Sequence, residues 1–244
     1  MEKLQGLPFA VQTVHGELAY DTLIGLREQH TELTPVVLGD DEEVERLLEM
    51  AEEDERDFAQ ILAAANDINV TTWVEEKHQA LQAMLAEFDE ADGEFDAADD
   101  DDEAEFEMLD DEEAEFMPHL STLAYDIVSG EAKPRVHLGL IPVAQSWQVP
   151  AFLKIGDWNE CPEAAVHVAF FKYWYEQYGA VVSAISSDTI EFSVARPPAT
   201  PEQARILAHQ QYMYCADIVD QGVETEENLA QTLLDADNWF FWWD

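Results

Sequence analysis

A cysteine and a histidine six residues apart are the side chains of this sequence best suited to nucleophilic chemistry. Cys161 stands directly before an expected helix that starts at Pro162, and His167 lies on that helix. A thiolate needs a base or a helix N-terminus to lower its pKa, so Cys161 and His167 form the candidate catalytic pair of a cysteine-dependent enzyme. Six helical residues turn through about 600°, however. We therefore expect His167 to point away from Cys161, and Cys161 to pack as a small buried group beside a turn capped by Asn159.

The two cysteines and two of the histidines also form a loose set of possible zinc ligands, Cys161 with His167 and His209 with Cys215. Tetrahedral zinc sites normally use close pairs such as C-x2-C or H-x3-H, whereas five residues separate the members of each pair here. We therefore expect no metal ion and no cofactor. Both cysteines fit a reducing compartment in which thiols stay free, and the spacing alone leaves a disulfide between Cys161 and Cys215 open.

The elements that must position these residues are clearest after residue 133, where the composition is that of an ordinary globular domain. Proline in the first turn and glycine after the last turn mark a helix at residues 162–178. Runs of β-branched residues on either side of a polar turn predict a hairpin. The expected strands are residues 136–143, 180–185 and 189–195, and the further helices are residues 200–215, capped by Thr200, and residues 229–234, capped by Thr225. The aromatic end at residues 239–244 predicts a buried terminal strand.

The N-terminal part predicts a short helix at residues 21–30 and a strand at residues 35–38. Apolar residues then recur with the 3.6-residue period of an amphipathic helix over residues 41–65, behind Asp40 as the N-cap. Thr72, with a glutamate three residues later, is typical of a capping box. It predicts another helix that leads into the acidic segment.

Together these patterns predict an α+β fold, with a mixed sheet, flanking helices and an acidic, partly disordered insertion. The chain has 244 residues and 47% hydrophobic content, enough for a sizeable core. We expect residues 1–77 to be an N-terminal α/β part of the same fold unit. Residues 78–132 would hold a helix and the acidic insertion, and residues 133–244 a C-terminal α+β domain.

The charge of the chain is strongly and unevenly negative. The formal net charge is -43, and residues 78–132 contain no lysine or arginine. Phosphate groups bind to clustered cations, so we expect no direct nucleic-acid binding and no binding to anionic membranes. The same field attracts cationic surfaces and favours a basic protein as the partner. Residues 1–9 carry no secretory signal and no stretch is long enough to span a membrane, which predicts a cytoplasmic protein.

The acidic segment, residues 87–116, holds 18 carboxylates and allows three interpretations. It is a solvated linker, it mimics a nucleic-acid backbone or covers a basic cleft of a partner, or it adapts the protein to high salt. Its interspersed aromatic residues favour partner binding, because segments that fold on binding need apolar anchors. The candidate partner-binding residues are Phe95, Asp99, Asp100, Asp101, Asp102, Glu103, Phe106, Met108 and Phe116.

Several motifs follow one another in the second half of the chain. They are WNECP at residues 158–162, YWYEQYGA at 173–180, ARPP at 195–198, YCADIVDQGV at 214–223 and WFFWWD at 239–244. Through them the chain resembles the bacterial domain-of-unknown-function 4253 family from about residue 136 to residue 244, and PVVLGDD at residues 35–41 resembles the N-terminal part of that family. The resemblance implies a shared fold unit, assigns no activity and carries over no catalytic residue. In that comparison residues 87–116 look like an expansion of a variable connection.

These observations predict a binding protein rather than an enzyme. The favoured function is an acidic module that inhibits or sequesters a basic protein, such as a toxin or a nucleic-acid-acting enzyme, in the manner of an immunity protein or a nucleic-acid mimic. Residues 40–57 and 87–116 would steer the partner, and the apolar residues of the acidic segment would anchor it. Two alternatives stay open: a cysteine-dependent enzyme centred on Cys161, and a salt-adapted protein of unknown function.

Overall fold

A six-stranded mixed sheet organises the part of the chain that the computed structural model describes, residues 7–92 and 121–244, with only the helical backbone described for residues 88–92. The strands are β1 (Ala10–Val14), β2 (Thr34–Gly39), β3 (Val136–Ile141), β4 (Ala180–Ile185), β5 (Thr189–Val194) and β6 (Asn238–Trp242). Their order across the sheet is β1-β3-β2-β4-β5-β6. β2 runs parallel to β4, and the other neighbouring strands are antiparallel. The expected α+β class with a mixed sheet is confirmed.

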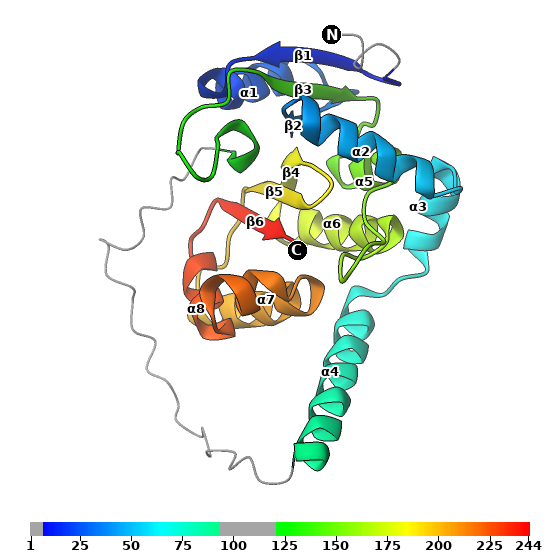
Figure 1. The fold of residues 1–244 in the computed structure, drawn as a ribbon, viewed down its shortest axis with the longest axis vertical. Helices are drawn as coiled ribbons and strands as arrows, with labels where there is room; N and C mark the ends of the chain where they lie inside the picture. Colours follow the sequence, from blue (N-terminus) through cyan, green and yellow to red (C-terminus); the bar gives the residue numbers. More distant parts are fainter. Residues whose placement is uncertain (1–6, 93–120) are drawn as a thin grey trace.

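Most of the long helices pack on one face of this sheet. The helices are α1 (Ala19–Gln29), α2 (Asp41–Glu53), α3 (Phe58–Asn66), α4 (Val70–Asp92), α5 (Val149–Leu153), α6 (Ala164–Tyr178), α7 (Pro201–Tyr214) and α8 (Glu226–Leu233), with short 3-10 turns η1 (Gly16–Leu18), η2 (Thr122–Ala124) and η3 (Ser146–Gln148) and a π-helical turn η4 (Ile218–Val223). α6 packs against β4, α2 packs against β2 and β3, and α7 packs with α8 below β6 (Figure 1). This face carries the main core.

Aromatic side chains form the centre of that core. The alternation of β6 turns Trp239 and Phe241 inward, and Trp243 follows them; all three are buried. Trp174 of α6 stacks on Phe241, with ring centroids 5.2 Å apart and an interplanar angle of 11°. Burying one large apolar side chain contributes about 1.5–3 kcal/mol. The aromatic end is therefore a buried terminal strand, as the sequence predicts.

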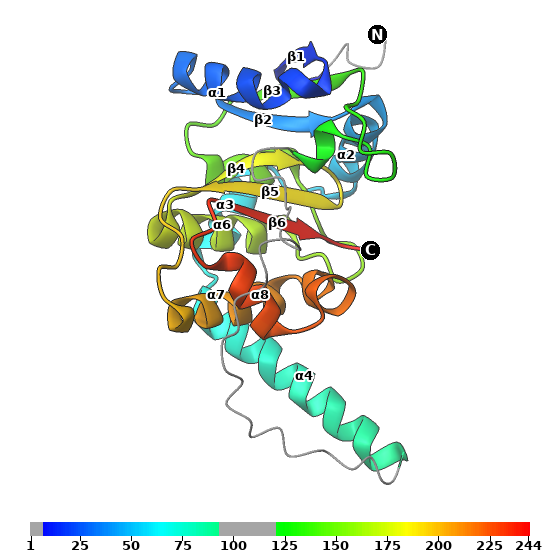
Figure 2. The ribbon, with the colours of Figure 1, turned by 90° about the vertical axis from the view of Figure 1, so that its left-hand side faces the viewer.

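The other face of the sheet is covered only in part among the described residues. α1 and η2 form a smaller apolar cluster there with β2 and β3, in which Val37 and Leu138 are buried. Along β5 the two faces alternate, because Phe192 is in the main core whereas Glu191 and Ser193 line a pocket on the other side. Figure 2 shows β2, β4, β5 and β6 side by side, with α1 beside β2 and β3 in the other half of the sheet. The β4–β6 half of this face is therefore left open to form that pocket.

The expected helix at residues 41–65 is two helices, α2 and α3, which corrects the prediction. Asp57 begins α3 by accepting a hydrogen bond from the Gln60 amide at 2.9 Å, while the Gln60 side chain accepts one from the Asp57 amide at 2.8 Å. Arg56, in the connection, pairs with Glu163 at 2.5 Å and ties this break to the start of α6. A capping box and a long-range ion pair together favour a new helix start over continuation.

The start of α4 also differs from the prediction. Asn69, not Thr72, supplies the N-terminal cap, because the Asn69 side chain accepts a hydrogen bond from the Thr72 amide at 3.0 Å. Thr72 is an exposed residue of the first turn. Asp40, by contrast, caps α2 as predicted, accepting hydrogen bonds from the amides of Glu42 and Glu43. Both caps satisfy amide groups that a helix start leaves without partners.

The elements expected after residue 133 are present within three residues of their predicted bounds. β1, α5 and η4 were not predicted. Of the acidic segment at residues 87–116, whose partial disorder was an expectation, residues 93–116 lie outside the described residues. No helix within the described ranges is both long enough and apolar enough to cross a membrane.

Candidate functional site

The structure brings Cys161 and His167 together, contrary to the expectation from helical geometry. The Cys161 sulfur lies 3.5 Å from Nε2 of His167. The expectation was wrong because α6 begins only at Ala164, so the residues before it form a tight turn instead of a helical one. In that turn the Cys161 amide donates to the Trp158 carbonyl at 2.9 Å. The turn sets the sulfur beside the first turn of α6, where His167 lies.

A buried tyrosine completes this cluster. His167 and Tyr214 are 0% and 1% exposed, and Nδ1 of His167 is hydrogen-bonded to the Tyr214 hydroxyl. The His167 ring also packs against Trp243, with centroids 5.6 Å apart. Cys161 is buried as well. Both imidazole nitrogens therefore have partners inside the core, which is what buried polar atoms require for stability.

Burial also sets the protonation of the cluster. It raises the pKa of the Cys161 thiol far above its ordinary range, with nearby Cys215 acting in the same direction. Burial lowers the pKa of His167 to about 3, while the Pro162 carbonyl raises it less. At neutral pH the thiol and the imidazole are therefore both uncharged. The cluster lacks the thiolate that nucleophilic chemistry uses.

His209 and Cys215, the second pair of possible zinc ligands, make contacts other than with Cys161 and His167. Nδ1 of His209 is 3.1 Å from a carboxylate oxygen of Glu226, and its ring packs against His78 of α4 with centroids 5.0 Å apart. Cys215 is buried, and its sulfur donates to the Trp242 carbonyl at 3.0 Å. Both cysteines are free thiols, so the structure holds no disulfide between them. Among the described residues no three His, Cys, Asp or Glu side chains are grouped closely enough to hold a metal ion.

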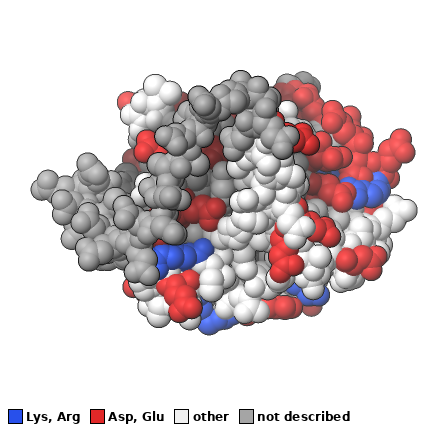
Figure 3. Space-filling model, turned by 90° about the horizontal axis from the view of Figure 1, so that it is seen from below, with Lys and Arg blue, Asp and Glu red and all other residues white. Residues whose placement is uncertain are grey.

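The residues predicted to bind a partner all lie outside the described residues. They are Phe95, Asp99, Asp100, Asp101, Asp102, Glu103, Phe106, Met108 and Phe116. The described surface is itself acidic, and Asp and Glu predominate over Lys and Arg on the face drawn in Figure 3. On α2 the cation Arg46 pairs with Glu42 at 2.5 Å, while Glu49, Glu52 and Glu53 are exposed. The negative field of the chain is thus present on ordered helices.

The helix α4 is fixed to the rest of the protein along its first half. Val70 and Val74 are buried, and the Trp73 ring packs edge-on against Phe170 of α6 with centroids 5.1 Å apart. One turn further, His78 makes its ring contact with α7. These contacts anchor residues 70–78 against α6 and α7.

Beyond His78, α4 projects away from the sheet and its helices (Figures 1 and 2). Residues 82–87 are all exposed, and Met84 and Leu85 expose 49% and 50% of their surface. Residues 79–86 carry no charged side chain. Contiguous exposed apolar residues mark interaction surfaces, and a helix that makes no tertiary contacts is marginally stable in water. Leu81 is partly buried against the main core, so the projecting segment is residues 82–87. It is the candidate docking element of the described structure.

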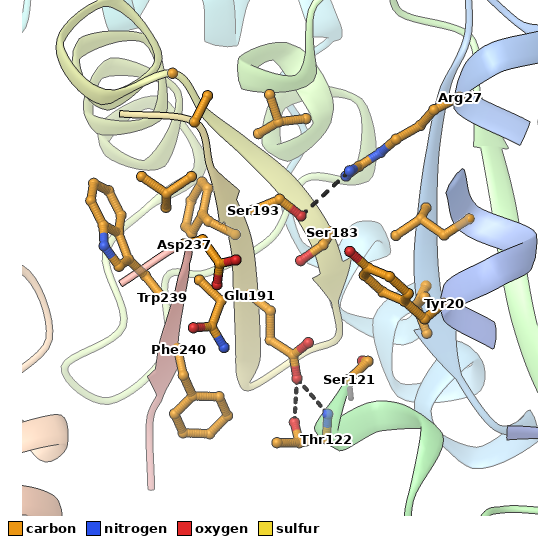
Figure 4. A pocket seen from close by; sticks show the side chains of 18 residues that line it. Tyr20, Arg27, Ser121, Thr122, Ser183, Glu191, Ser193, Asp237, Trp239 and Phe240 are labelled. Carbon is orange, nitrogen blue, oxygen red and sulfur yellow. Dashed lines mark hydrogen bonds between the residues drawn. The ribbon is translucent and has the colours of Figure 1, made fainter. Parts of the chain in front are cut away.

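A pocket of about 390 Å³ lies on the partly covered face of the sheet, between α1, η2 and strands β4 to β6 (Figure 4). Arg27 of α1 reaches into it and donates to the Val182 carbonyl at 2.7 Å and to the Ser193 hydroxyl at 3.4 Å. Glu191 of β5 faces the same pocket. Its Oε1 accepts hydrogen bonds from the Thr122 amide at 2.6 Å and from the Thr122 hydroxyl at 2.5 Å. The pocket thus has a cation and a carboxylate on different walls.

Sequence reasoning missed this pocket, although two signals pointed toward it. Glu191 and Ser193 alternate with buried apolar residues, which is the pattern of a strand with a polar face. Arg27 is one of only 11 basic residues and lies one position beyond buried Leu26 on α1. Neither signal predicts that α1 lies close to β5. Arg27 and Glu191 line the same pocket only because of the order of the strands in the sheet.

Comparison with known proteins identifies the C-terminal part of the chain. The model of the family described as Domain of unknown function (DUF4253) matches residues 137–244. The match confirms the resemblance seen in the second half of the sequence and does not reach residues 35–41, whose resemblance stays a prediction. No curated protein and no solved structure matches the chain. The matched range contains the Cys161 cluster and the strands of the pocket but not α4.

Proposed function

From the premise that residues 137–244 form a DUF4253 domain, we propose that this protein binds a basic protein and thereby inhibits or sequesters it. The partner class is a toxin or a nucleic-acid-acting enzyme, and the protein acts in the manner of an immunity protein or a nucleic-acid mimic. The proposal includes a cytoplasmic location, which two free and buried thiols support because reducing compartments keep cysteines unpaired.

The exposed end of α4 is the observation that carries this proposal. Met84 and Leu85 are exposed and lie at the i+3 and i+4 positions from Leu81, a spacing that places all three side chains on one helix stripe. Leu81 is partly buried at the inner end of the stripe, against the main core. An amphipathic helix of this kind binds by laying its apolar stripe into a groove of a partner. Because the first half of α4 is packed on α6 and α7, the stripe is presented at a fixed place on the protein.

The acidic charge supplies the other part of the proposed mechanism. Residues 87–116 continue the chain directly from the projecting segment and carry 18 carboxylates, so charge and apolar stripe act on the same partner. A net charge of -43 steers a basic protein toward this surface and repels nucleic acids. In this proposal Phe95, Phe106 and Phe116 add apolar anchors once the partner is bound.

A cysteine-dependent enzyme is the second candidate, and the 3.5 Å contact between Cys161 and His167 favours it. Its requirements are an accessible thiolate and a base that can accept the thiol proton. Cys161 is buried with its thiol pKa raised, His167 is buried with its pKa lowered, and neither residue lines the pocket beside Arg27. These features support a structural role for the pair over a catalytic one.

Site-specific photo-crosslinking tests the proposal. A benzophenone amino acid replaces Leu85 in the full chain, which is expressed in its native cells. The lysate of these cells is then irradiated at low salt. We expect one dominant crosslinked protein with a net positive charge, and loss of the crosslink at high salt. The matched control carries the same amino acid at Ile206 of α7, which is 55% exposed. It should not capture that protein.

The outcomes separate the candidates. Equal crosslinking at the two positions, or a captured protein without excess basic residues, would overturn the proposed binding function. The salt-adaptation alternative predicts instead that the protein unfolds when salt is withdrawn, which circular dichroism measures in the same buffers. A folded protein at low salt together with a Leu85-specific crosslink supports partner binding.

A further inference from the structure

Arg27 is a partly buried cation that pairs with no Asp or Glu among the described residues. Arg46, Arg56 and Arg205 each pair with a carboxylate, whereas the bonds that hold Arg27 come from the Val182 carbonyl and the Ser193 hydroxyl. Burial lowers the pKa of Arg27, but arginine stays protonated at neutral pH. Burying a charge without a counter-charge is costly. Arg196 also bonds only carbonyl oxygens, but it is exposed to solvent. Arg27 is therefore the partly buried arginine of the described residues that lacks a carboxylate partner, which indicates a subsite for an anion.

The wall opposite this cation is acidic. Glu191 is held by the two hydrogen bonds from Thr122, and Asp237 lines the same pocket. Figure 4 shows the Glu191 carboxylate turned toward Thr122 and the Arg27 guanidinium turned toward Ser193. The two charges therefore do not neutralise one another directly. Each has bonding capacity left for a bound molecule.

The distance between the two subsites follows from strand geometry. Ser193, which Arg27 contacts, and Glu191 are two residues apart on β5 and face the same side. Two strand residues span about 7 Å, and the Glu191 carboxylate is turned toward Thr122, away from Arg27. The cationic and acidic subsites are therefore separated by at least that length. Between and around them the lining includes Tyr20 and Phe240, which offer apolar ring surface. The volume of about 390 Å³ lies in the range of small-ligand pockets.

We propose that this pocket binds a small zwitterion whose carboxylate pairs with Arg27 and whose cationic nitrogen, at least about 7 Å away, pairs with Glu191. A simple anion would meet the carboxylates of Glu191 and Asp237, and a simple cation would meet Arg27. A molecule with both charges satisfies both walls, and its zero net charge avoids repulsion by the acidic protein. Small dipeptides share this chemistry. Free lysine and arginine carry the same two groups and one further positive charge, which the acidic protein does not repel.

Isothermal titration of the full chain with matched probes tests the charge pattern. The reference probe is 6-aminohexanoate, and hexanoate and hexylamine each lack one of its charges. We expect 6-aminohexanoate to bind at least about tenfold more tightly than either, because each charge-assisted pair adds affinity. L-lysine and glycyl-leucine then distinguish a free basic amino acid from a small dipeptide as the ligand. The compound that binds more tightly identifies the ligand class.

Substitutions assign the two ends. Arg27→Gln should weaken 6-aminohexanoate binding about 10- to 100-fold and leave hexylamine unchanged, while Glu191→Gln should weaken hexylamine and leave hexanoate unchanged. Should Arg27→Gln fail to fold, Arg27→Lys keeps the charge and loses the forked geometry, and it should weaken the same probe less. Ile206→Ser, on α7, is the control that changes neither affinity.

Three results would overturn this inference. One is the absence of binding by 6-aminohexanoate, L-lysine and glycyl-leucine at about 10 mM, a concentration at which even weak specific sites fill. Another is equal affinity for the three matched probes, which removes the need for two charges. The last is binding that both substitutions leave unchanged. Each result concerns the pocket alone and leaves the docking role of α4 to its own test.

Discussion

A functional site usually combines reactive side chains with exposure to a ligand. In this protein the Cys161 cluster has the reactive side chains, and the projecting segment of α4 has the exposure. Cys161 and His167 are reactive residue types in contact, yet they are buried and uncharged in the core. Residues 82–87 contain no reactive side chain apart from one glutamate, yet they are exposed and include the apolar Met84 and Leu85. Residue type alone therefore does not identify an accessible site in this chain. Exposure and charge point to α4 and to the pocket beside Arg27.

The largest effect that we expect is on the reactivity of the Cys161 thiol, which tests whether the Cys161 cluster is as inaccessible as its burial indicates. We expect iodoacetamide at pH 7 to modify Cys161 about a thousand-fold more slowly in the folded protein than in urea, because the raised thiol pKa and burial leave almost no accessible thiolate. Cys215, also buried with its thiol pKa raised to about 12, should behave in the same way and serves as the internal control. Rapid modification of Cys161 alone would favour the enzyme alternative. Mass spectrometry of the labelled protein measures both sites.

A matched pair of substitutions compares the stability of the two regions. His167→Ala should lower the free energy of unfolding by about 2–4 kcal/mol, because it opens a cavity and removes the partner of the buried Tyr214 hydroxyl. Leu85→Ser, on the exposed segment, should change that free energy by less than about 0.5 kcal/mol. Urea unfolding followed by tryptophan fluorescence measures both. Similar losses would mean that α4 is part of the stable core.

The pH dependence of stability sharpens the description of His167. The pKa of His167 is about 3 in the folded protein, against an ordinary value of 6.5 for histidine. Below pH 6.5 the unfolded chain therefore binds a proton at His167 that the folded protein does not bind. Stability is therefore lost as pH falls from 6.5 toward 3, by about 1.4 kcal/mol per pH unit from this group. His167→Asn removes this loss. The difference in unfolding free energy between the two proteins should shrink between pH 6 and pH 4, and parallel profiles would show that His167 is not held neutral.

Local patterns predicted most of the strands and helices, and failed where distant residues decide. Gly179, Thr200 and Thr225 end or cap their helices as expected, because these signals act within one turn. The break before Asp57 depends partly on an ion pair between residues 56 and 163, which periodicity does not contain.

The surroundings of the candidate site residues also depend on distant parts of the chain. The contact between Cys161 and His167 depends on a turn before α6 that the motif did not reveal. The pocket depends on the strand order, which brings α1 of the N-terminal part beside β5. The predicted partner-binding residues lie outside the described residues, and the described α4 that leads toward them gives the docking proposal its structural support.

The affinity for the crosslinked partner, measured against salt concentration, tests the central claim most directly. The proteins compared are the unaltered chain, the double variant Met84→Ser with Leu85→Ser, and Ile206→Ser as the surface control. The proposed function predicts that the double variant binds at least about tenfold more weakly at every salt concentration, and that raising the salt weakens the unaltered chain and Ile206→Ser alike. Unchanged affinity in the double variant, or binding that salt does not weaken, would contradict it.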